Sequence, residues 1–244
     1  MSSPQALSAP VSELAPGLHR IELGGGFVSA YLLDGDDGLV LVDTGPPGSA
    51  GAILGALGSL GRDASGLATI LVTHAHADHS GSAAALRDAT GARVVMSQLD
   101  AELIASGWAS RGLTFLPGAE ETIPTPPGLT LADLVEPSPI DAFDVDGHLE
   151  AGAVPGVQGI EAIPAPGHCA GQMAVLWNGH GGVLICGDAV TNFGEIAIAP
   201  VGEDLDLSRK SAADLSKREF EIATFGHGDP VVGGAAATLR AALA

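Results

Sequence analysis

Cationic side chains are scarce in this sequence. Its 244 residues include 10 Lys and Arg against 29 Asp and Glu, which gives a formal net charge of −19 at pH 7. A surface with this charge repels the phosphates of nucleic acids over most of its area. We therefore expect no nucleic-acid partner.

Long apolar runs and cysteines are also few. No basic residue precedes Arg20, and no apolar run approaches the roughly 20 residues that span a membrane. We expect no membrane partner and a cytoplasmic location. The two cysteines, Cys169 and Cys186, are too few for a disulfide framework, and we expect both to be buried free thiols.

The order of the apolar runs predicts one α/β domain. Hydrophobic residues make up 46% of the chain and 35 residues are glycine, which is typical of a compact fold with many tight turns. From residue 17 strand-like runs come first, and helix-like and strand-like runs then alternate up to Gly107. We expect residues 1–16 to form a loose lead-in and residues 17–244 a single domain.

The regular alternation stops after Gly107. Six of the 16 prolines fall between residues 117 and 139, which indicates a long loop. We expect residues 108–157 to be an insertion that covers a pocket, with Trp108 and Phe115 either lining this pocket or lying in the core.

A basic helix is predicted near the C-terminus. The run "DLSRKSAADLSKREF" favours a helix capped by Asp206 or Ser208. Its segment 208–218 holds four of the ten basic residues, which either bind a substrate carboxylate or phosphate or form a solvent-exposed face. The second interpretation is favoured.

Histidine, in contrast, is concentrated in one stretch. The segment "THAHADHSG", residues 73–81, follows the apolar run "ATILV" and holds three of the eight histidines. In an extended chain, side chains two residues apart point the same way, so His74 and His76 can bind one ion while Asp78 and His79 turn to a second. Imidazole and carboxylate ligands suit zinc best, and iron or manganese also fit.

Two catalytic ions need more ligands than this one loop supplies. Three further strand-like runs end in a glycine turn that carries a His or Asp: "PGHC" with His168, "CGDA" with Asp188 and "FGHGD" with His227. Their shared place at strand ends groups them with the first stretch. Structural zinc sites are usually closed and rich in cysteine, so this set favours a catalytic centre. The remaining histidines are outside the pattern and are assigned no role: His19, His148 and His180.

Five sequence elements in this order resemble the metallo-β-lactamase-fold hydrolases. They are the H-x-H-x-D-H motif at 74–79, "PGH" at 166–168, "GD" at 187–188, "GHG" at 226–228 and the early "LVDTG" at 41–45. The resemblance covers the chain from about residue 17, except for the proline-rich stretch. It implies a four-layer αββα sandwich, two sheets face to face with helices outside, and a dinuclear site at one edge between the sheets.

Carried over by matching position, the resemblance implies two Zn²⁺ ions, each held by three residues of its own and bridged by Asp188. Asp43 would support the metal-binding loop from behind. The ligands implied for the first metal are His74, His76 and His168, and those for the second are Asp78, His79 and His227. A hydroxide shared by the two metals would attack a carbonyl, and Asp78 or Asp188 would orient it and pass its proton to the leaving group.

Within this family the sequence favours hydrolysis of a small acyl thioester or ester. Zinc β-lactamases lack the bridging aspartate that Asp188 matches, and the nucleases carry cationic surfaces. Hydroxyacylglutathione hydrolases share the ligand set but typically add a helical domain, whereas 17 residues follow His227 here. Quorum-signal lactonases place a tyrosine shortly after the bridging aspartate, where this chain has Phe193, and its single tyrosine, Tyr31, is far away in sequence.

Other interpretations stay open. A lactonase of the acyl-homoserine lactone type and a β-lactamase-like amidohydrolase are the alternatives within hydrolysis. An iron-dependent redox protein or a non-catalytic metal-binding protein are alternatives outside it. The substrate, the physiological metal and the oligomeric state are not fixed by the sequence.

Overall fold

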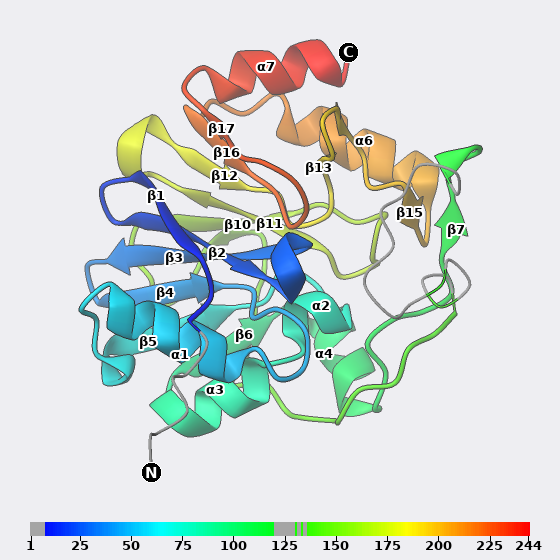
Figure 1. Cartoon of the computed structure of the whole chain (residues 1–244). Coiled ribbons are helices and arrows are strands. Elements are labelled where there is room, and N and C mark those ends of the chain that lie inside the picture. The colour runs from blue at the N-terminus through cyan, green and yellow to red at the C-terminus, as the bar shows by residue number, and fades with distance from the viewer. Residues whose placement is uncertain (1–7, 120–129, 131–132, 134–135) are drawn as a thin grey trace.

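Two β-sheets face each other between two layers of helices (Figure 1). The computed structural model describes residues 8–119, 130, 133 and 136–244. The first sheet has the order β1-β2-β3-β4-β5-β6-β8 and the second the order β17-β16-β12-β11-β10-β9. The predicted αββα sandwich is therefore confirmed.

The first sheet is formed by the N-terminal half of the chain. Its strands are β1 (Val11–Ala15), β2 (Leu18–Leu23), β3 (Val28–Gly35), β4 (Gly38–Val42), β5 (Leu67–Leu71), β6 (Arg93–Met96) and β8 (Gly147–His148). The first four are antiparallel to one another, and β4, β5, β6 and β8 are parallel. The helices of this half are α1 (Ala50–Ser59), α2 (Ala77–Ser80), α3 (Ala83–Thr90) and α4 (Gln98–Ala105).

The second sheet comes from the C-terminal half. Its strands are β9 (Gly152–Ala153), β10 (Ile160–Pro164), β11 (Met173–Trp177), β12 (Val183–Ile185), β16 (Ile222–Thr224) and β17 (Val231–Val232). The outer helices of this half are α6 (Leu205–Leu215) and α7 (Ala235–Ala242). Two short ribbons pair β13 (Thr191–Asn192) with β14 (Ile196–Ala197), and β7 (Thr114–Phe115) with β15 (Val201–Gly202).

The molecule has three hydrophobic cores, and side chains of one strand alternate between two of them. In β3, Ala30 and Leu32 join the core between the first sheet and its helices, while Tyr31 and Leu33 join the core between the sheets. Successive side chains of a strand point to opposite faces, so a continuous apolar strand fills both cores. A third core packs the second sheet against α6 and α7.

The structure corrects two predictions. Within the expected loose lead-in of residues 1–16, Val11–Ala15 forms an edge strand that pairs with β2, so this expectation is wrong there, and residues 1–7 are outside the described residues. The strand was not predicted because residues 11–15 mix polar and apolar side chains and several of them are exposed. The second correction concerns α6, whose cap is Asp204 rather than Asp206 or Ser208: the Asp204 carboxylate accepts from the Leu207 N–H at 2.9 Å.

The expected insertion at 108–157 contributes to a two-stranded ribbon near its start and to both large sheets near its end. Its residues form β7, β8 and β9, and Trp108, which is 44% exposed, makes a bridge with Pro139. Most of the segment 120–135 is outside the described residues, so the covering of a pocket stays a prediction. Among the described helices, none has the length and apolar character needed to cross a membrane.

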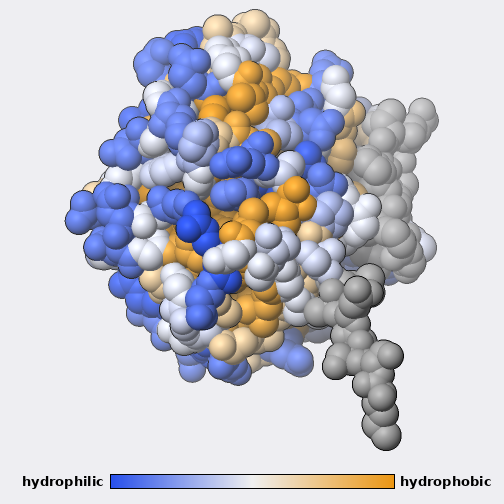
Figure 2. Space-filling view, turned by 60° about the vertical axis from the view of Figure 1, so that its left-hand side comes forward, coloured by the Kyte–Doolittle hydropathy of each residue, from blue (hydrophilic) through white to orange (hydrophobic). Residues whose placement is uncertain are grey.

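The visible surface is largely polar. Figure 2 shows one face of the molecule, on which hydrophilic residues predominate and apolar patches lie between them. Two of the basic side chains of the segment 208–218 pair with nearby acids: Arg209 on α6 with Asp206 at 2.7 Å, and Lys217, just after α6, with Asp214 at 2.6 Å. These exposed pairs agree with a solvent-exposed face for this helix.

Tyr31 connects the two halves of the fold from inside the core. Its hydroxyl donates to the Phe225 carbonyl at 2.7 Å, and burial raises the pKa of Tyr31 to about 12, so the hydroxyl stays protonated. We expect Tyr31→Phe to lower the free energy of unfolding by about 1–2 kcal/mol, because a buried carbonyl loses its donor. Urea unfolding of the metal-free protein measures this, and an unchanged unfolding free energy would show that the bond contributes nothing.

Candidate metal centre

The ends of the parallel strands deliver the histidine-rich loop. β4 and β5 run parallel, so the residues after them, Asp43 and residues 73–79, reach the same edge of the sheet. The Asp43 N–H donates to the Leu71 carbonyl at 2.9 Å, and Asp43 has a φ of 63°, which turns the chain sharply there. This geometry places the Asp43 carboxylate behind the loop.

Three loops of the second sheet reach the same edge. His168 lies in the turn between β10 and β11, Asp188 follows β12, and His227 follows β16. Strands β12 and β16 are parallel neighbours, so the loops after them are adjacent. The sandwich thus brings together all seven side chains that the sequence singles out as metal ligands.

The first cluster contains the three histidines implied for the first metal. The ligand atoms of His74, His76 and His168 lie within 4.8 Å of one another, and all three side chains are buried. The His168 Nε2 lies 3.0 Å from the His76 Nδ1. Three converging imidazoles are a ligand set that suits a divalent cation.

The second cluster contains Asp78, His79 and His227. The Asp78 Oδ2 lies 3.7 Å from the His79 Nε2 and 3.3 Å from the His227 Nε2. Asp78 is the accessible member, since 32% of its side chain is exposed while His79 is fully buried. The cluster is therefore open to solvent on the Asp78 side.

Asp188 lies between the two clusters. Its Oδ2 is 3.6 Å from the His168 Nε2 of the first cluster and 3.1 Å from the His227 Nε2 of the second. Its Oδ1 is 3.4 Å from the His79 Nε2. One carboxylate is thus in reach of both groups, which is the arrangement that a bridging ligand requires.

Buried atoms without partners show that these residues fit metal ions. The His74 Nε2, the His79 Nε2 and the Asp188 Oδ1 are buried and have no hydrogen-bond partner. Leaving such atoms unpaired is costly, and here they point into one shared space. Nitrogen and carboxylate donors suit a divalent ion such as zinc, and which ion binds stays a prediction.

Four of the histidines have an oxygen atom within hydrogen-bond distance of the ring nitrogen Nδ1. The Asp43 Oδ2 lies 2.8 Å from the His79 Nδ1, and the two Asp43 oxygens also accept from the N–H and the hydroxyl of Thr73 at 2.8 and 2.9 Å. The remaining Nδ1 contacts are His74 with Thr73 Oγ1, His168 with the Val201 carbonyl and His227 with the Phe27 carbonyl. Such contacts fix the ring and leave Nε2 free for a metal.

Electrostatics divide the two clusters. Burial lowers the pKa of His74 well below its usual range, and burial together with His168 lowers the pKa of His76 to about 3. Burial also disfavours charge on His79 and His227, but Asp188 and Asp78 outweigh it and raise the pKa of both, to about 10 for His227. Without metal, these shifts favour neutral imidazoles at His74 and His76 and imidazolium groups at His79 and His227.

This division predicts unequal proton release. Histidine binds a metal only when its ligating nitrogen is deprotonated. At pH 7.5 the ion that enters the second cluster must displace about two protons, from His79 and His227, whereas His74 and His76 have none to lose. We expect the affinity for that ion to rise by about tenfold per pH unit for each proton released.

Calorimetric titration with Zn²⁺ in buffers of different ionisation enthalpy measures these protons. The His168→Ala variant isolates the second cluster and the His227→Ala variant the first. Equal proton release in the two variants would contradict the predicted division.

The sequence patterns did not identify three charged residues beside the first cluster. Asp100 is fully buried, and its Oδ2 accepts from the N–H of Ala75, the residue between His74 and His76. Arg111 contacts both Asp100 and Glu203. They lie on separate elements without a common motif. The available signal was Asp100, an acidic residue on the apolar face of its helix.

Several other residues lie outside the cluster. The two cysteines are buried free thiols, as predicted. Burial raises the pKa of both, and Asp100 and Glu203 raise that of Cys169 further. Tyr31 is buried against Phe225 and not at the metal ligands, while Phe193 is 41% exposed and stacks on His227 with ring centroids 5.8 Å apart.

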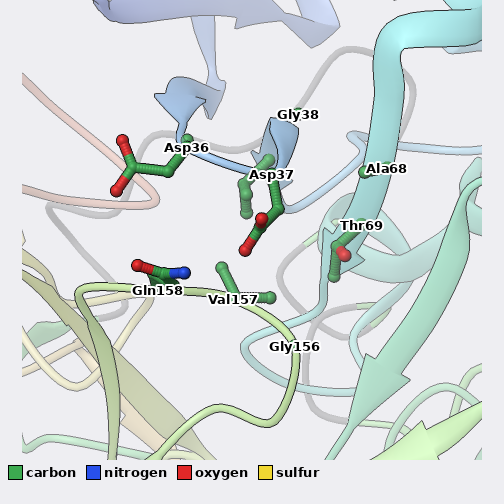
Figure 3. A pocket seen from close by; sticks show the side chains of 10 residues that line it. Asp36, Asp37, Gly38, Ala68, Thr69, Gly156, Val157 and Gln158 are labelled. Carbon is green, nitrogen blue, oxygen red and sulfur yellow. The ribbon is translucent and has the colours of Figure 1, made fainter.

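One small cavity lies at the start of β4 and β5, whereas the candidate metal ligands lie beyond the ends of these strands (Figure 3). Asp36, Asp37, Thr69 and Val157 line it, and its volume is about 10 Å³. This volume holds about one water molecule. The cavity is therefore separate from the metal ligands and too small for a substrate.

The fold is that of a metallo-hydrolase, and its His and Asp clusters are able to bind metal. The family model of the metallo-beta-lactamase superfamily matches residues 23–234. The chain belongs to this superfamily, and this membership supports a metal-dependent hydrolase.

Two proteins of Bacillus subtilis (strain 168) are similar to this chain. The chain is 33% identical over 173 residues to the uncharacterized protein YobT, covering 70% of this chain and 66% of YobT. It is 26% identical over 215 residues to the probable metallo-hydrolase YflN, covering 80% of this chain and 76% of YflN. The chain therefore spans about two thirds of the length of YobT.

A solved structure shows the same fold. BJP-1, a subclass B3 metallo-beta-lactamase of Bradyrhizobium japonicum, superposes with a TM-score of 0.68 at 22% identity, covering 98% of this chain and 93% of BJP-1. At this identity the likeness concerns the fold alone.

Proposed function

We propose that this chain hydrolyses a small, neutral acyl thioester or ester at a dinuclear metal centre. The observation that carries the proposal is the contact of Asp188 with both clusters, at 3.6 Å from His168 and 3.1 Å from His227. Two metal ions in such a site lower the pKa of a bound water to about 7 and stabilise the oxyanion that forms when a carbonyl is attacked.

Asp78 and Asp188 supply the carboxylates for proton transfer. Burial alone would raise the pKa of both, but His79 and His227 more than offset this and hold it below its usual range. Both side chains therefore stay ionised at neutral pH, accept hydrogen bonds from an attacking water and orient it. Asp78, at the open side, is placed to receive the proton.

The leaving group decides between substrate classes. A carboxyl group with a lowered pKa is almost fully ionised at neutral pH, so it rarely holds a proton that it could transfer to the leaving group. A thiolate needs little help, because a thiol has a pKa of about 8.5, whereas an alkoxide or an amide nitrogen must be protonated as it leaves. This difference favours a thioester, with an oxygen ester second.

Aromatic and basic residues near the clusters support a neutral substrate. Phe193 stacks on His227 and has no hydroxyl with which to polarise a lactone carbonyl. Arg111 lies beside the first cluster, but its guanidinium is occupied by Asp100 at 3.3 Å and Glu203 at 3.1 Å. It is therefore not free to bind a substrate phosphate or carboxylate.

Initial hydrolysis rates of the zinc-loaded protein test the proposal. The panel contains a neutral acyl thioester of N-acetylcysteamine, the matching oxygen ester, the corresponding acyl-CoA, an acyl-homoserine lactone, a β-lactam and a phosphodiester. We expect the neutral thioester to be fastest and the phosphodiester to be inert. Faster lactone or β-lactam turnover would contradict the ranking, and no turnover of any carbonyl substrate would favour a redox or non-catalytic role.

A further inference from the structure

His76 is held differently from the other four histidines of the site. Its Nδ1 faces the first cluster, 3.0 Å from the His168 Nε2, and its Nε2 points to the Cys169 Sγ at 3.8 Å. A thiol at this distance orients an imidazole weakly. The position of His76 must therefore be fixed mainly through the backbone of its loop.

Asp100 provides this backbone support. It lies in the first turn of α4, its side chain is fully buried, and its Oδ2 accepts from the Ala75 N–H at 3.0 Å. Ala75 is the residue between His74 and His76, so this bond holds the segment that carries two ligands of the first cluster. The other oxygen, Oδ1, receives the Arg111 Nη1 at 3.3 Å.

Glu203 holds the third ligand in the same way. Its N–H donates to the His168 carbonyl at 3.1 Å, and its Oε2 accepts from the Ala170 N–H at 3.1 Å. Its Oε1 receives the Arg111 Nη1, also at 3.1 Å. Glu203 therefore fixes the turn that carries His168 from both sides.

Arg111 is the residue that joins these two supports. One Nη1 atom contacts the carboxylate behind the His74 and His76 segment and the carboxylate behind the His168 turn. Its Nη2 donates to the Leu99 carbonyl at 3.0 Å, which fixes the guanidinium against α4. The second cluster depends on other contacts, those of Asp43 with His79 and of the Phe27 carbonyl with His227.

We propose that Arg111 is a positioning residue for the first metal: through Asp100 and Glu203 it holds the two loops of the His74, His76 and His168 cluster at binding distance. The inference rests on the metal centre of the proposed function and not on its substrate. Without Arg111, the buried Asp100 carboxylate and the partly exposed Glu203 carboxylate lie near each other with uncompensated charge, and their repulsion separates the loops. The affinity of the first cluster then falls while that of the second is kept.

Metal titration of single-cluster variants tests this selectivity. Arg111→Met is combined with His227→Ala, which leaves the first cluster whole, and separately with His168→Ala, which leaves the second whole. Co²⁺ is added to each metal-free protein, its visible absorption reports binding, and competition with a chelator gives the affinity. Arg218→Met is the matched control, because Arg218 is also half-exposed and pairs with a glutamate, Glu161.

We expect Arg111→Met to lower Co²⁺ affinity about 10- to 100-fold in the His227→Ala background and less than about twofold in the His168→Ala background. Arg111→Lys should recover part of the loss, and Arg218→Met should change neither affinity. Unchanged affinity of the first cluster, or equal losses in both backgrounds, would overturn the proposal. Should Arg111→Met fail to fold, Glu203→Gln replaces it, with the same selective loss expected. Because no substrate is used, the result is independent of whether the thioester proposal holds.

Discussion

Asp188→Asn is expected to lower kcat of the zinc-loaded protein about 1000-fold, which corresponds to about 4 kcal/mol of lost transition-state stabilisation. Asparagine keeps the shape of the side chain but loses the charge that faces His168, His79 and His227 together. An amide nitrogen also cannot accept where a carboxylate oxygen does. Both clusters then lose the carboxylate that lies between them.

Metal content by elemental analysis accompanies the kinetics. We expect the bound zinc to fall from about two ions to about one per chain, since the second cluster then keeps only Asp78 as a negative ligand. Asp206→Asn on α6 is the control, because that aspartate is exposed and pairs with Arg209. A variant that holds two ions and turns over at the original rate would show that Asp188 is not shared.

The proximity of the candidate ligands could be predicted from the sequence because these residues lie in local motifs. His74, His76, Asp78 and His79 lie within six positions after one buried strand, and the other ligands each follow an apolar run and a glycine. Strand ends of a sandwich meet at one edge, so local position implied proximity. The two-sheet architecture followed from the order of strand-like and helix-like runs together with the resemblance.

The supports behind the ligands could not be read in this way. Arg111 and Glu203 are 92 residues apart and meet only because β7 pairs with β15 close to them. Their contact is a product of the tertiary fold, without any periodicity or spacing to signal it. The strand at Val11–Ala15 was hidden for a related reason: an edge strand gains its structure from its neighbour rather than from its own apolar pattern.

The role of Asp43 could be predicted from its motif, but its contacts could not. The motif "LVDTG" indicates a supporting aspartate, and the structure shows what the support consists of: contacts with the Thr73 N–H, the Thr73 hydroxyl and the His79 Nδ1. Asp43 and Asp100 thus hold the same loop from two sides, one toward each cluster. The loop between them has little freedom to adjust its ligands.

This rigidity makes Gly226 a sensitive position although it is not a ligand. A Cβ added at Gly226 would overlap the Asp188 Oδ1 and lie 2.5 Å from the His79 Cε1. Neither side chain can move away, because both are buried and His79 is fixed by Asp43. We expect Gly226→Ala to lower kcat at least about 100-fold and to abolish binding of the second ion, although alanine removes no ligand atom.

Gly51→Ala is the matched control for this substitution. Gly51 lies in α1 with nothing within 4 Å of an added Cβ, so alanine there should raise the unfolding free energy by up to about 1 kcal/mol and leave the metal content at two ions. Zinc content and thermal unfolding of both metal-free variants separate the two effects. Full zinc binding by Gly226→Ala would mean that Asp188 and His79 can shift, and the two clusters would then not depend on a rigid loop. Loss of one ion with the fold retained would show that the second cluster needs glycine at position 226, because any Cβ there displaces Asp188 and His79.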